Sequence, residues 1–431
     1  MFQKFATFVR WTLVLIGIYI VFEILSGAYA IVSGGSFVDL IWFFAGNLHT
    51  DTEGRTNILL LGTGGENHDG GGGELTDSII VASYNHELNT LSMLSIPRDF
   101  WVEASDGGGM RVNKIYEYER IQLDDEQAAL ESVAKMASSI ANVPIHYYVK
   151  VDFTAFSDFV DALGGVKITV DEAIDDPYYP CENLVDYCPF SIAAGTQTLD
   201  GKTALEYARS RKTTSDFDRA ARQQKIIAAL REKAFEKDIL TSPTKLKAIW
   251  SIFEERVATN LRFREILMLG KIADEFDKQN MATIVLNDEP TAVGGVLYPP
   301  DRADYGGAAV LLPLGNDFLR IHAITNILFN HPRVAIEQRA IEVLNGSGRG
   351  GIAERAAYAL NRYGLNTKRV NNYPGGKLPE TTIYIYEESA RETAEILQGF
   401  VGGQIEFGPV ELQKRGFDIS LVLGQNWKDL E

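Results

Sequence analysis

The sequence predicts an α/β (α+β-like) fold with a large domain, in which a central sheet is flanked by helices, and a small carboxy-terminal α/β domain. Apolar runs of strand length alternate with segments of helical periodicity from Asn57 onward. The same alternation returns between Val334 and Gly424, in a unit of about 90 residues, which suffices for a small domain. An apolar run long enough to cross a bilayer precedes both units.

The large domain is predicted over residues 57–330, and its elements are justified by apolar runs between turn residues. Strands are expected at residues 57–61, 78–84, 91–96, 146–151 and 166–170. Helices are expected at residues 124–140, 153–163, 202–209, 217–235 and 321–329, and near Ile249 and Ile266. Residues 297–314 are irregular and rich in Pro and Gly, and Pro332 is expected to break the last helical pattern.

The carboxy-terminal domain is predicted over residues 333–424. The expected order is strand, helix, strand, strand, helix and strand, at residues 340–345, 351–364, 366–372, 381–387, 390–401 and 418–424. Asn345 and the three residues after it form a turn that is explained equally by a tight entry into the helix and by ligand contact through backbone amides.

The amino terminus predicts a single-pass cell-membrane protein whose two domains lie outside the cytoplasm. Lys4 and Arg10 precede the apolar run, so residues 1–10 form a short cytoplasmic tail, 11–33 a transmembrane anchor and 34–56 a juxtamembrane linker. The alternative is a signal peptide cleaved near Ala28 to Ala30. Apolar character continues past that site, which favours the uncleaved anchor.

Composition restricts the function. The 431 residues are 45% hydrophobic and 23% charged, which is typical of a folded protein. A net charge of -17 opposes nonspecific attraction to nucleic acid or to anionic lipid surfaces. A site for an anionic substrate therefore needs a local concentration of positive charge.

Two cysteines, Cys181 and Cys188, lie in one stretch rich in Pro and Tyr. Outside the cytoplasm they would most simply form a disulfide, and two free thiols are the alternative. Metal binding by this pair is not expected, because no second Cys or His pair stands at ligand spacing.

Arginines concentrate between residues 209 and 224. Arg219 and Arg222 share one face of an expected helix, and Asp216 precedes it, where an acidic residue can cap the amino end. Together with Arg209 and Arg211 they offer guanidinium groups that can grip phosphates bidentately. The structural alternative is a solvated basic surface.

A second cluster, Arg98 and Asp99, follows an expected strand, at the sheet edge where α/β proteins bind ligands. Asp77 enters another strand and could ligate magnesium held mainly by substrate phosphates. The alternatives are an ordinary surface ion pair and a turn residue. No P-loop, no Ser-His-Asp arrangement and no histidine metal spacing are present in the sequence.

The order of these motifs resembles the catalytic domain of the LytR-CpsA-Psr family. The segments are NILLLG, TDSIIVASYN, LSMLSIPRDFWV, RVNKIY, HYYVKVDFTAFSDFVDALGGVKITV, LDGKTALEYARSR and DRAARQQ. The segment that begins IEVLNGSGRGGIAERAAYAL resembles the LytR carboxy-terminal domain that follows it in some members.

The resemblance implies an enzyme that transfers a phosphoglycan from a polyprenyl pyrophosphate to peptidoglycan, typically to a muramic acid hydroxyl, and releases polyprenyl phosphate. It places Arg98, Asp99 and Asp216 in catalysis and Asp77 at a magnesium ion. It assigns the pyrophosphate to Arg209, Arg211, Arg219, Arg222 and Gln223. Asp99 or Asp216 either accepts the proton of the acceptor or orients an arginine.

The chain departs from the family pattern at two places. Gly64 and Glu66 stand where the family often has an aspartate and an arginine, and Leu75 replaces a second arginine. Glu66, Asp69 or Glu74 could supply the missing carboxylate.

These losses keep two alternatives open, a hydrolase of the lipid pyrophosphate and a wall-binding or lipid-head-group-binding protein without enzymatic activity. A nucleic-acid partner is not expected, because the chain is acidic and only about ten residues precede the anchor.

Overall fold

The computed structural model describes residues 47–63, 74–179, 181, 187–210 and 243–429, together with residues 222, 225, 226, 229, 230, 232 and 233. The chain divides into two compact units, one of residues 1–49 and 261–276 and one of residues 50–260 and 277–431. The predicted membrane anchor lies outside the described residues, and none of the helices that are described is long and apolar enough to cross a membrane. The predicted localisation therefore stays a prediction.

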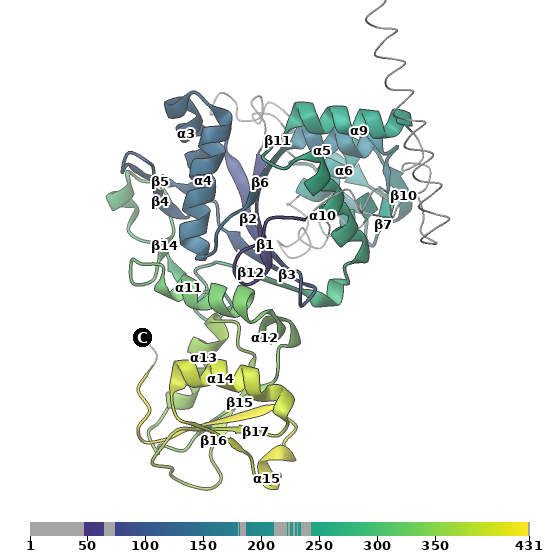
Figure 1. The fold of residues 1–431 in the computed structure, drawn as a ribbon. Helices are drawn as coiled ribbons and strands as arrows, with labels where there is room; N and C mark the ends of the chain where they lie inside the picture. Colours follow the sequence, from purple (N-terminus) through teal and green to yellow (C-terminus); the bar gives the residue numbers. More distant parts are fainter. Residues whose placement is uncertain are drawn as a thin grey trace, which may run out of the picture. The chain divides into compact units, whose positions relative to one another are not determined.

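A six-stranded mixed sheet forms the centre of the first part of the second unit (Figure 1), in the order β11-β6-β1-β2-β3-β12. Its strands are β1 (Arg55–Thr63), β2 (Thr76–Asn85), β3 (Thr90–Ile96), β6 (Tyr147–Asp152), β11 (Val257–Thr259) and β12 (Met281–Val285). The neighbours β1 and β6, and likewise β3 and β12, run parallel, while the other pairs are antiparallel. The carboxyl ends of β1, β3, β6 and β12 therefore meet the start of β2 at one edge, which we call the site edge.

Helices cover both faces of this sheet, as the alternation predicted. Figure 1 shows α3 (Ile115–Leu123) and α4 (Glu126–Ala141) on one side, and α5 (Phe153–Ala162), α6 (Gly201–Arg209) and α9 (Pro243–Arg256) on the other. Asp125 caps the amino end of α4, where its side chain accepts from the Ala128 amide. The helix buries Leu130, Val133 and Ala137, which lie at helical spacing, against the core.

The strand predicted at residues 166–170 is confirmed, but it lies in a small subdomain beside the central sheet. Here β7 (Val166–Val170) pairs with β10 (Gly195–Leu199), and β8 (Ile174–Asp176) pairs with β9 (Phe190–Ile192). Apolar residues of these strands, α5 and α6 form a separate core cluster.

The carboxy-terminal part holds a five-stranded sheet of order β16-β15-β19-β17-β18. The six predicted elements are β15 (Ile341–Asn345), α13 (Ile352–Arg362), β16 (Thr367–Asn372), β17 (Thr382–Ile385), α14 (Arg391–Val401) and β19 (Ile419–Leu423). Two short elements are additional, β18 (Gln404–Phe407) and α15 (Val410–Gln413). This domain is therefore α/β, as predicted.

The prediction that Pro332 ends the helical pattern is only partly right. Helix α11 (Leu319–Thr325) continues into a π-helical turn, Asn326–Asn330, and Pro332 then begins a new short helix, α12 (Pro332–Glu337). Proline suits the first turn of a helix because the amide that it lacks has no partner there. The Ser92 hydroxyl of β3 donates to the Leu328 carbonyl of the π turn at 2.7 Å.

The remaining elements are mostly short. They are β4 (Trp101–Glu103), β5 (Gly109–Arg111), β13 (Leu297–Tyr298), β14 (Leu312–Pro313) and α10 (Phe263–Glu275), with 3-10 turns at Val112–Lys114, Lys278–Asn280, Arg302–Tyr305 and Glu388–Ala390.

Candidate functional site

Two of the predicted site residues meet at the site edge. Arg98 lies just after β3, and its Nη1 is 3.3 Å from Oδ1 of Asp77, the second residue of β2. The two side chains are 47% and 45% exposed. The antiparallel pairing of β2 with β3 brings these residues together although they are 21 positions apart in the sequence. Their charges are thus fixed by the sheet yet open to a ligand.

Asp99 extends this ion-pair chain. One of its carboxylate oxygens lies 3.7 Å from Nε of Arg98, and the other accepts from Nη1 of Arg111 at 3.1 Å. Arg111 ends β5, which pairs with β4 so that Arg111 stands opposite Trp101. We call Asp77, Arg98, Asp99 and Arg111 the exposed chain. Sequence reasoning missed Arg111, although RVNKIY was recognised as a motif, because nothing local indicates that β5 folds back beside Asp99.

A second charged group lies at the same edge, where Lys150, Glu74 and Tyr116 are buried and Glu126 is half exposed. The Lys150 ammonium is 2.8 Å from carboxylate oxygens of Glu74 and Glu126 and 2.8 Å from the Tyr116 hydroxyl. The Tyr116 hydroxyl also donates to Glu126, and Thr63 donates to Glu74. We call Lys150, Glu74, Glu126 and Tyr116 the buried network. In this structure Glu74 thus bonds to Lys150 and Thr63.

The hydrogen bonds of the buried network stabilise the charged forms of Lys150 and Glu126. Burial disfavours the charged form of Lys150, but hydrogen bonds to Glu126, Glu74 and Tyr116 outweigh it and raise the lysine pKa. Burial alone would raise the pKa of Glu126, yet the hydrogen bonds from Lys150 and Tyr116 lower it below its ordinary value. Burial raises the pKa of Tyr116. Lys150, Glu126 and Tyr116 therefore each keep one protonation state near neutral pH.

The described part of the arginine-rich segment gathers at the end of α6. Nη1 of Arg209 is 3.4 Å from the Tyr179 hydroxyl, and its guanidinium lies 5.8 Å from the centre of that ring. Arg222 is buried, and its guanidinium donates to the carbonyls of Tyr207 at 3.0 Å and Ser210. These carbonyls belong to the last turn of α6, which ends without intrahelical partners for them. Arg222 thus fixes the helix end that carries Arg209.

Several predicted residues lie outside the described residues. They are Arg211, Asp216, Arg219 and Gln223, and the alternative carboxylates Glu66 and Asp69. The structure therefore places the described site residues in two groups, the exposed chain at the site edge and the arginines at the end of α6.

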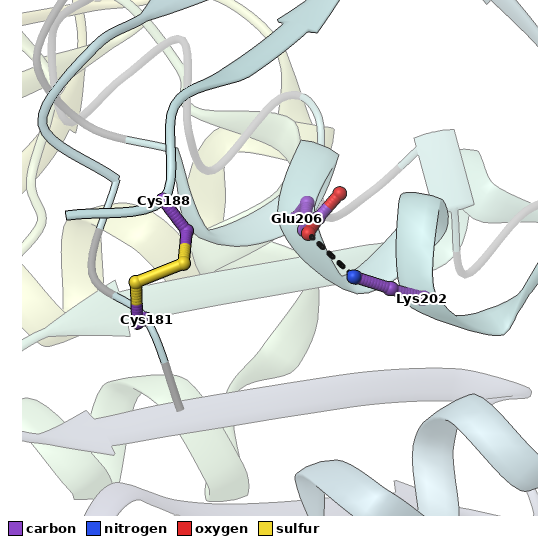
Figure 2. Close-up of a disulfide and its surroundings, with 4 residues drawn as sticks. All are labelled: Cys181, Cys188, Lys202 and Glu206. Carbon is purple, nitrogen blue, oxygen red and sulfur yellow. Dashed lines mark ion pairs between the residues drawn. A yellow bond between two sulfur atoms is a disulfide. The ribbon is translucent and has the colours of Figure 1, made fainter. Parts of the chain in front are cut away.

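The predicted disulfide is present. Cys181 and Cys188 are joined, and the Cys188 amide donates to the Tyr179 carbonyl at 2.8 Å. Figure 2 shows the disulfide beside α6, where Lys202 and Glu206 form an ion pair of 4.0 Å. We call the described residues between β8 and β9, which are 177–179, 181 and 187–189, the disulfide hairpin.

The donor set at the site edge is compatible with magnesium shared with phosphates. No group of three or more His, Cys, Asp or Glu side chains that could hold a metal ion occurs in the described part of the chain. Magnesium bound to substrate phosphates needs only one or two protein carboxylates. Asp77 and Asp99 provide two partly exposed carboxylates on either side of Arg98.

Family models match most of the chain. The model described as the LytR_cpsA_psr family matches residues 43–305. The model described as LytR cell envelope-related transcriptional attenuator matches residues 338–427.

Individual relatives agree with these matches. The chain is 25% identical to the cell wall biosynthesis protein LcpA of Corynebacterium glutamicum, over 82% of this chain and 70% of the relative. It is 28% identical to the polyisoprenyl-teichoic acid–peptidoglycan teichoic acid transferase TagU of Bacillus licheniformis, over 58% of this chain and 73% of the relative. The crystal structure of Bacillus subtilis TagV has 23% identity and a TM-score of 0.45, and the match covers 65% of this chain and 99% of that one.

Proposed function

Because this chain belongs to the LytR-CpsA-Psr family, we propose that it transfers a phosphoglycan from a polyprenyl-pyrophosphate carrier to peptidoglycan. Relatives named as teichoic acid transferases to peptidoglycan support this reaction. The observation that carries the proposal is the exposed chain, in which Arg98 stands between two carboxylates at the site edge.

The reaction forms one bond and breaks one. A hydroxyl oxygen of the peptidoglycan bonds to the phosphorus that bears the glycan, and the bond from that phosphorus to the bridging oxygen of the pyrophosphate breaks. Polyprenyl phosphate leaves with the electron pair, and the hydroxyl proton passes to a base. Such transfer depends mainly on positioning and on offsetting negative charge on the phosphate oxygens.

Arginines of this chain suit that task. We propose that Arg98 contacts the reacting phosphate and that Arg209, Arg211, Arg219 and Gln223 bind the pyrophosphate. Arg222 acts on a helix rather than on the substrate, because its guanidinium holds the carbonyls at the end of α6. It is therefore a positioning residue for Arg209.

Asp77 is proposed to hold Mg²⁺, whose chemistry is to offset charge on the phosphate oxygens. Asp99 contacts both Arg98 and Arg111, which supports an orienting role for this carboxylate. Asp216 then remains the candidate that accepts the acceptor's proton.

We also propose that the chain is a single-pass membrane protein with its folded parts outside the cytoplasm. The apolar run at residues 11–33 supports an anchor. The disulfide supports an oxidising compartment, because cytosolic thiols are kept reduced. Labelling of introduced cysteines with a membrane-impermeant reagent tests this topology, and protection of the folded parts in intact cells would contradict it.

The transfer proposal is tested with the full-length protein in detergent, a short-chain polyprenyl-pyrophosphate glycan, a peptidoglycan oligomer and Mg²⁺, with products identified by mass spectrometry. We expect a covalent phosphoglycan-peptidoglycan adduct. Replacing Arg98 by Ala removes a charged contact to the reacting phosphate and should lower the rate about 10²- to 10³-fold. Addition of EDTA should lower it as well.

Arg355 provides a matched control. It is an exposed arginine 3.2 Å from Asp429 in the carboxy-terminal part, so Arg355→Ala removes a similar ion pair away from the site edge. Equal losses in the two variants would remove Arg98 from the mechanism. Free phosphoglycan without adduct would identify a hydrolase, and donor binding without turnover would contradict an enzymatic role.

A further inference from the structure

Two tyrosines of the disulfide hairpin are held on its surface. The side chains of Tyr178 and Tyr187 are 52% and 61% exposed. Their ring centres are 5.6 Å apart, and the ring planes are nearly perpendicular at 88°. Four exposed large apolar side chains in the described part of the chain are aromatic, and these two contact each other. We call them the aromatic pair.

The scaffold fixes the aromatic pair in place. The disulfide joins Cys181, three residues after Tyr178, to Cys188, the residue after Tyr187. The Tyr178 amide donates to Oδ1 of Asp176, the last residue of β8, and the Cys188 amide donates to the Tyr179 carbonyl. Little conformational freedom then remains to be lost when a ligand binds, which favours binding.

The same scaffold links the aromatic pair to the arginines at the end of α6. Oδ2 of buried Asp176 accepts from the Ser210 hydroxyl at 2.8 Å. Arg209, the residue before Ser210, contacts Tyr179, which lies next to Tyr178 in the sequence. The backbone that carries the aromatic pair is therefore tied, through Asp176 and Tyr179, to the end of α6, where Arg209 lies.

The chemistry of this surface suits neutral sugars. A tyrosine ring offers an apolar face to the C–H groups of a pyranose, and its hydroxyl offers a hydrogen bond. Glu172, just before β8, and Asp175, within β8, are exposed and can accept from sugar hydroxyls, while they repel polyanions. A polyprenyl tail would need an apolar enclosure, whereas both tyrosines are more than half exposed at the surface.

We propose that the aromatic pair binds the neutral N-acetylated glycan strand of the peptidoglycan acceptor. This inference rests on the proposed function, because it deepens the acceptor side of that reaction. The donor already has charged anchors in the arginines, whereas an uncharged polymer needs a surface that recognises its sugar rings. A shallow, exposed aromatic surface whose backbone is tied to the end of α6 meets that need and leaves the strand free to extend in both directions.

The test compares wild type with a Tyr178→Ala/Tyr187→Ala variant, as full-length protein in detergent. Cosedimentation with purified peptidoglycan sacculi and titration with soluble N-acetylglucosamine oligomers measure acceptor binding. Titration with polyprenyl pyrophosphate measures donor binding. We expect acceptor affinity to fall about tenfold, as for loss of a buried aromatic contact, and donor affinity to stay unchanged.

Control variants separate a lost contact from a lost fold. Tyr358→Ala removes another exposed tyrosine, from α13, and should leave both affinities unchanged. Tyr178→Phe/Tyr187→Phe keeps the rings and should keep most of the acceptor affinity. Quantitation of free thiols after denaturation verifies the disulfide in each variant.

The outcomes distinguish a glycan site from a lipid contact, and the glycan site from the proposed transfer reaction. Unchanged sacculus and oligomer binding in the double Ala variant overturns the inference, and a loss confined to the donor lipid identifies a lipid contact instead. If the wild type binds sacculi through the aromatic pair but shows no transfer, the proposed function fails while the glycan site stands. If the wild type binds neither sacculi nor oligomers, the inference fails regardless of transfer.

Discussion

The site edge carries two groups of linked charges that differ in their access to solvent. The buried network places one ammonium between two carboxylates and a phenol, and each contact to Lys150 is 2.8 Å. The exposed chain alternates two carboxylates and two guanidiniums at distances from 3.1 to 3.7 Å. Lys150 and Glu74 are buried and in close contact, which favours a role in the fold, whereas Arg98 and Asp77 are open to solvent and can exchange their contact for one with a ligand. The difference indicates which charges serve the fold and which are available to a substrate.

The largest expected effect comes from the buried network. Lys150→Met removes a cation and leaves Glu74 buried without its charge partner, so the free energy of unfolding should fall by about 3–5 kcal/mol. Chemical denaturation followed by circular dichroism measures it.

The matched double variant sharpens this result. Lys150→Met/Glu74→Gln removes the charge of Glu74 as well and should recover part of the lost stability. A single Lys150→Met variant as stable as wild type would contradict the assignment of this group to the fold.

Arg111 tests the exposed chain. Without its contact to Asp99 at 3.1 Å, Asp99 can pair more fully with Arg98 and draw that guanidinium away from the phosphate. Arg111→Ala should lower kcat about tenfold to a hundredfold, while the free energy of unfolding changes by no more than about 0.5 kcal/mol. Arg111→Lys should recover part of the rate. A variant that loses stability but keeps its kcat would place Arg111 with the fold.

The smallest expected effect is a loss of folding stability at acid pH. Because hydrogen bonds from Lys150 and Tyr116 hold the pKa of Glu126 below its ordinary value of 4.5, this carboxylate stabilises the folded chain above that pH. The contribution is lost as the pH falls through the lowered value. The Glu126 side chain is half exposed, so the loss should stay below about 1 kcal/mol.

Denaturation of wild type and Glu126→Gln between pH 7 and pH 3 measures this contribution. The difference between the two proteins should shrink toward the acid end of the range, and a constant difference would contradict the shifted pKa.

Local patterns predicted the long elements well. The alternation in residues 166–170 located β7 to the residue, and helical periodicity located α4 within two residues at its start. Strand β12 was missed, because MATIV is short and follows a helical segment, and its parallel pairing with β3 identifies it. Elements of three to five residues, such as β18 and α15, depend in the same way on neighbours that are distant in sequence.

The sequence indicated which residues form the site, but not which of them contact one another. The positions of Asp77 and Arg98 at strand ends indicated one common edge, and the structure pairs them. The sequence could not distinguish Glu74 from Asp77, since both precede or enter the same strand. Their roles differ because Lys150, which is 76 residues away in the sequence, bonds to Glu74, whereas Asp77 contacts Arg98. Burial of Arg222 likewise depends on carbonyls at the end of another helix.

The π-helical turn at Asn326–Asn330 sets the direction in which the chain leaves the helix. Such a turn holds one residue more than an α-helical turn. Deleting one residue there would let α-helical pairing continue, and the side chains after the deletion in this turn would rotate by about 100° around the helix axis. The Leu328 carbonyl that Ser92 now satisfies would turn away from β3. The extra residue therefore sets the position from which the chain enters α12. We expect a deletion in this turn to disturb the fold more than a substitution of one of its side chains.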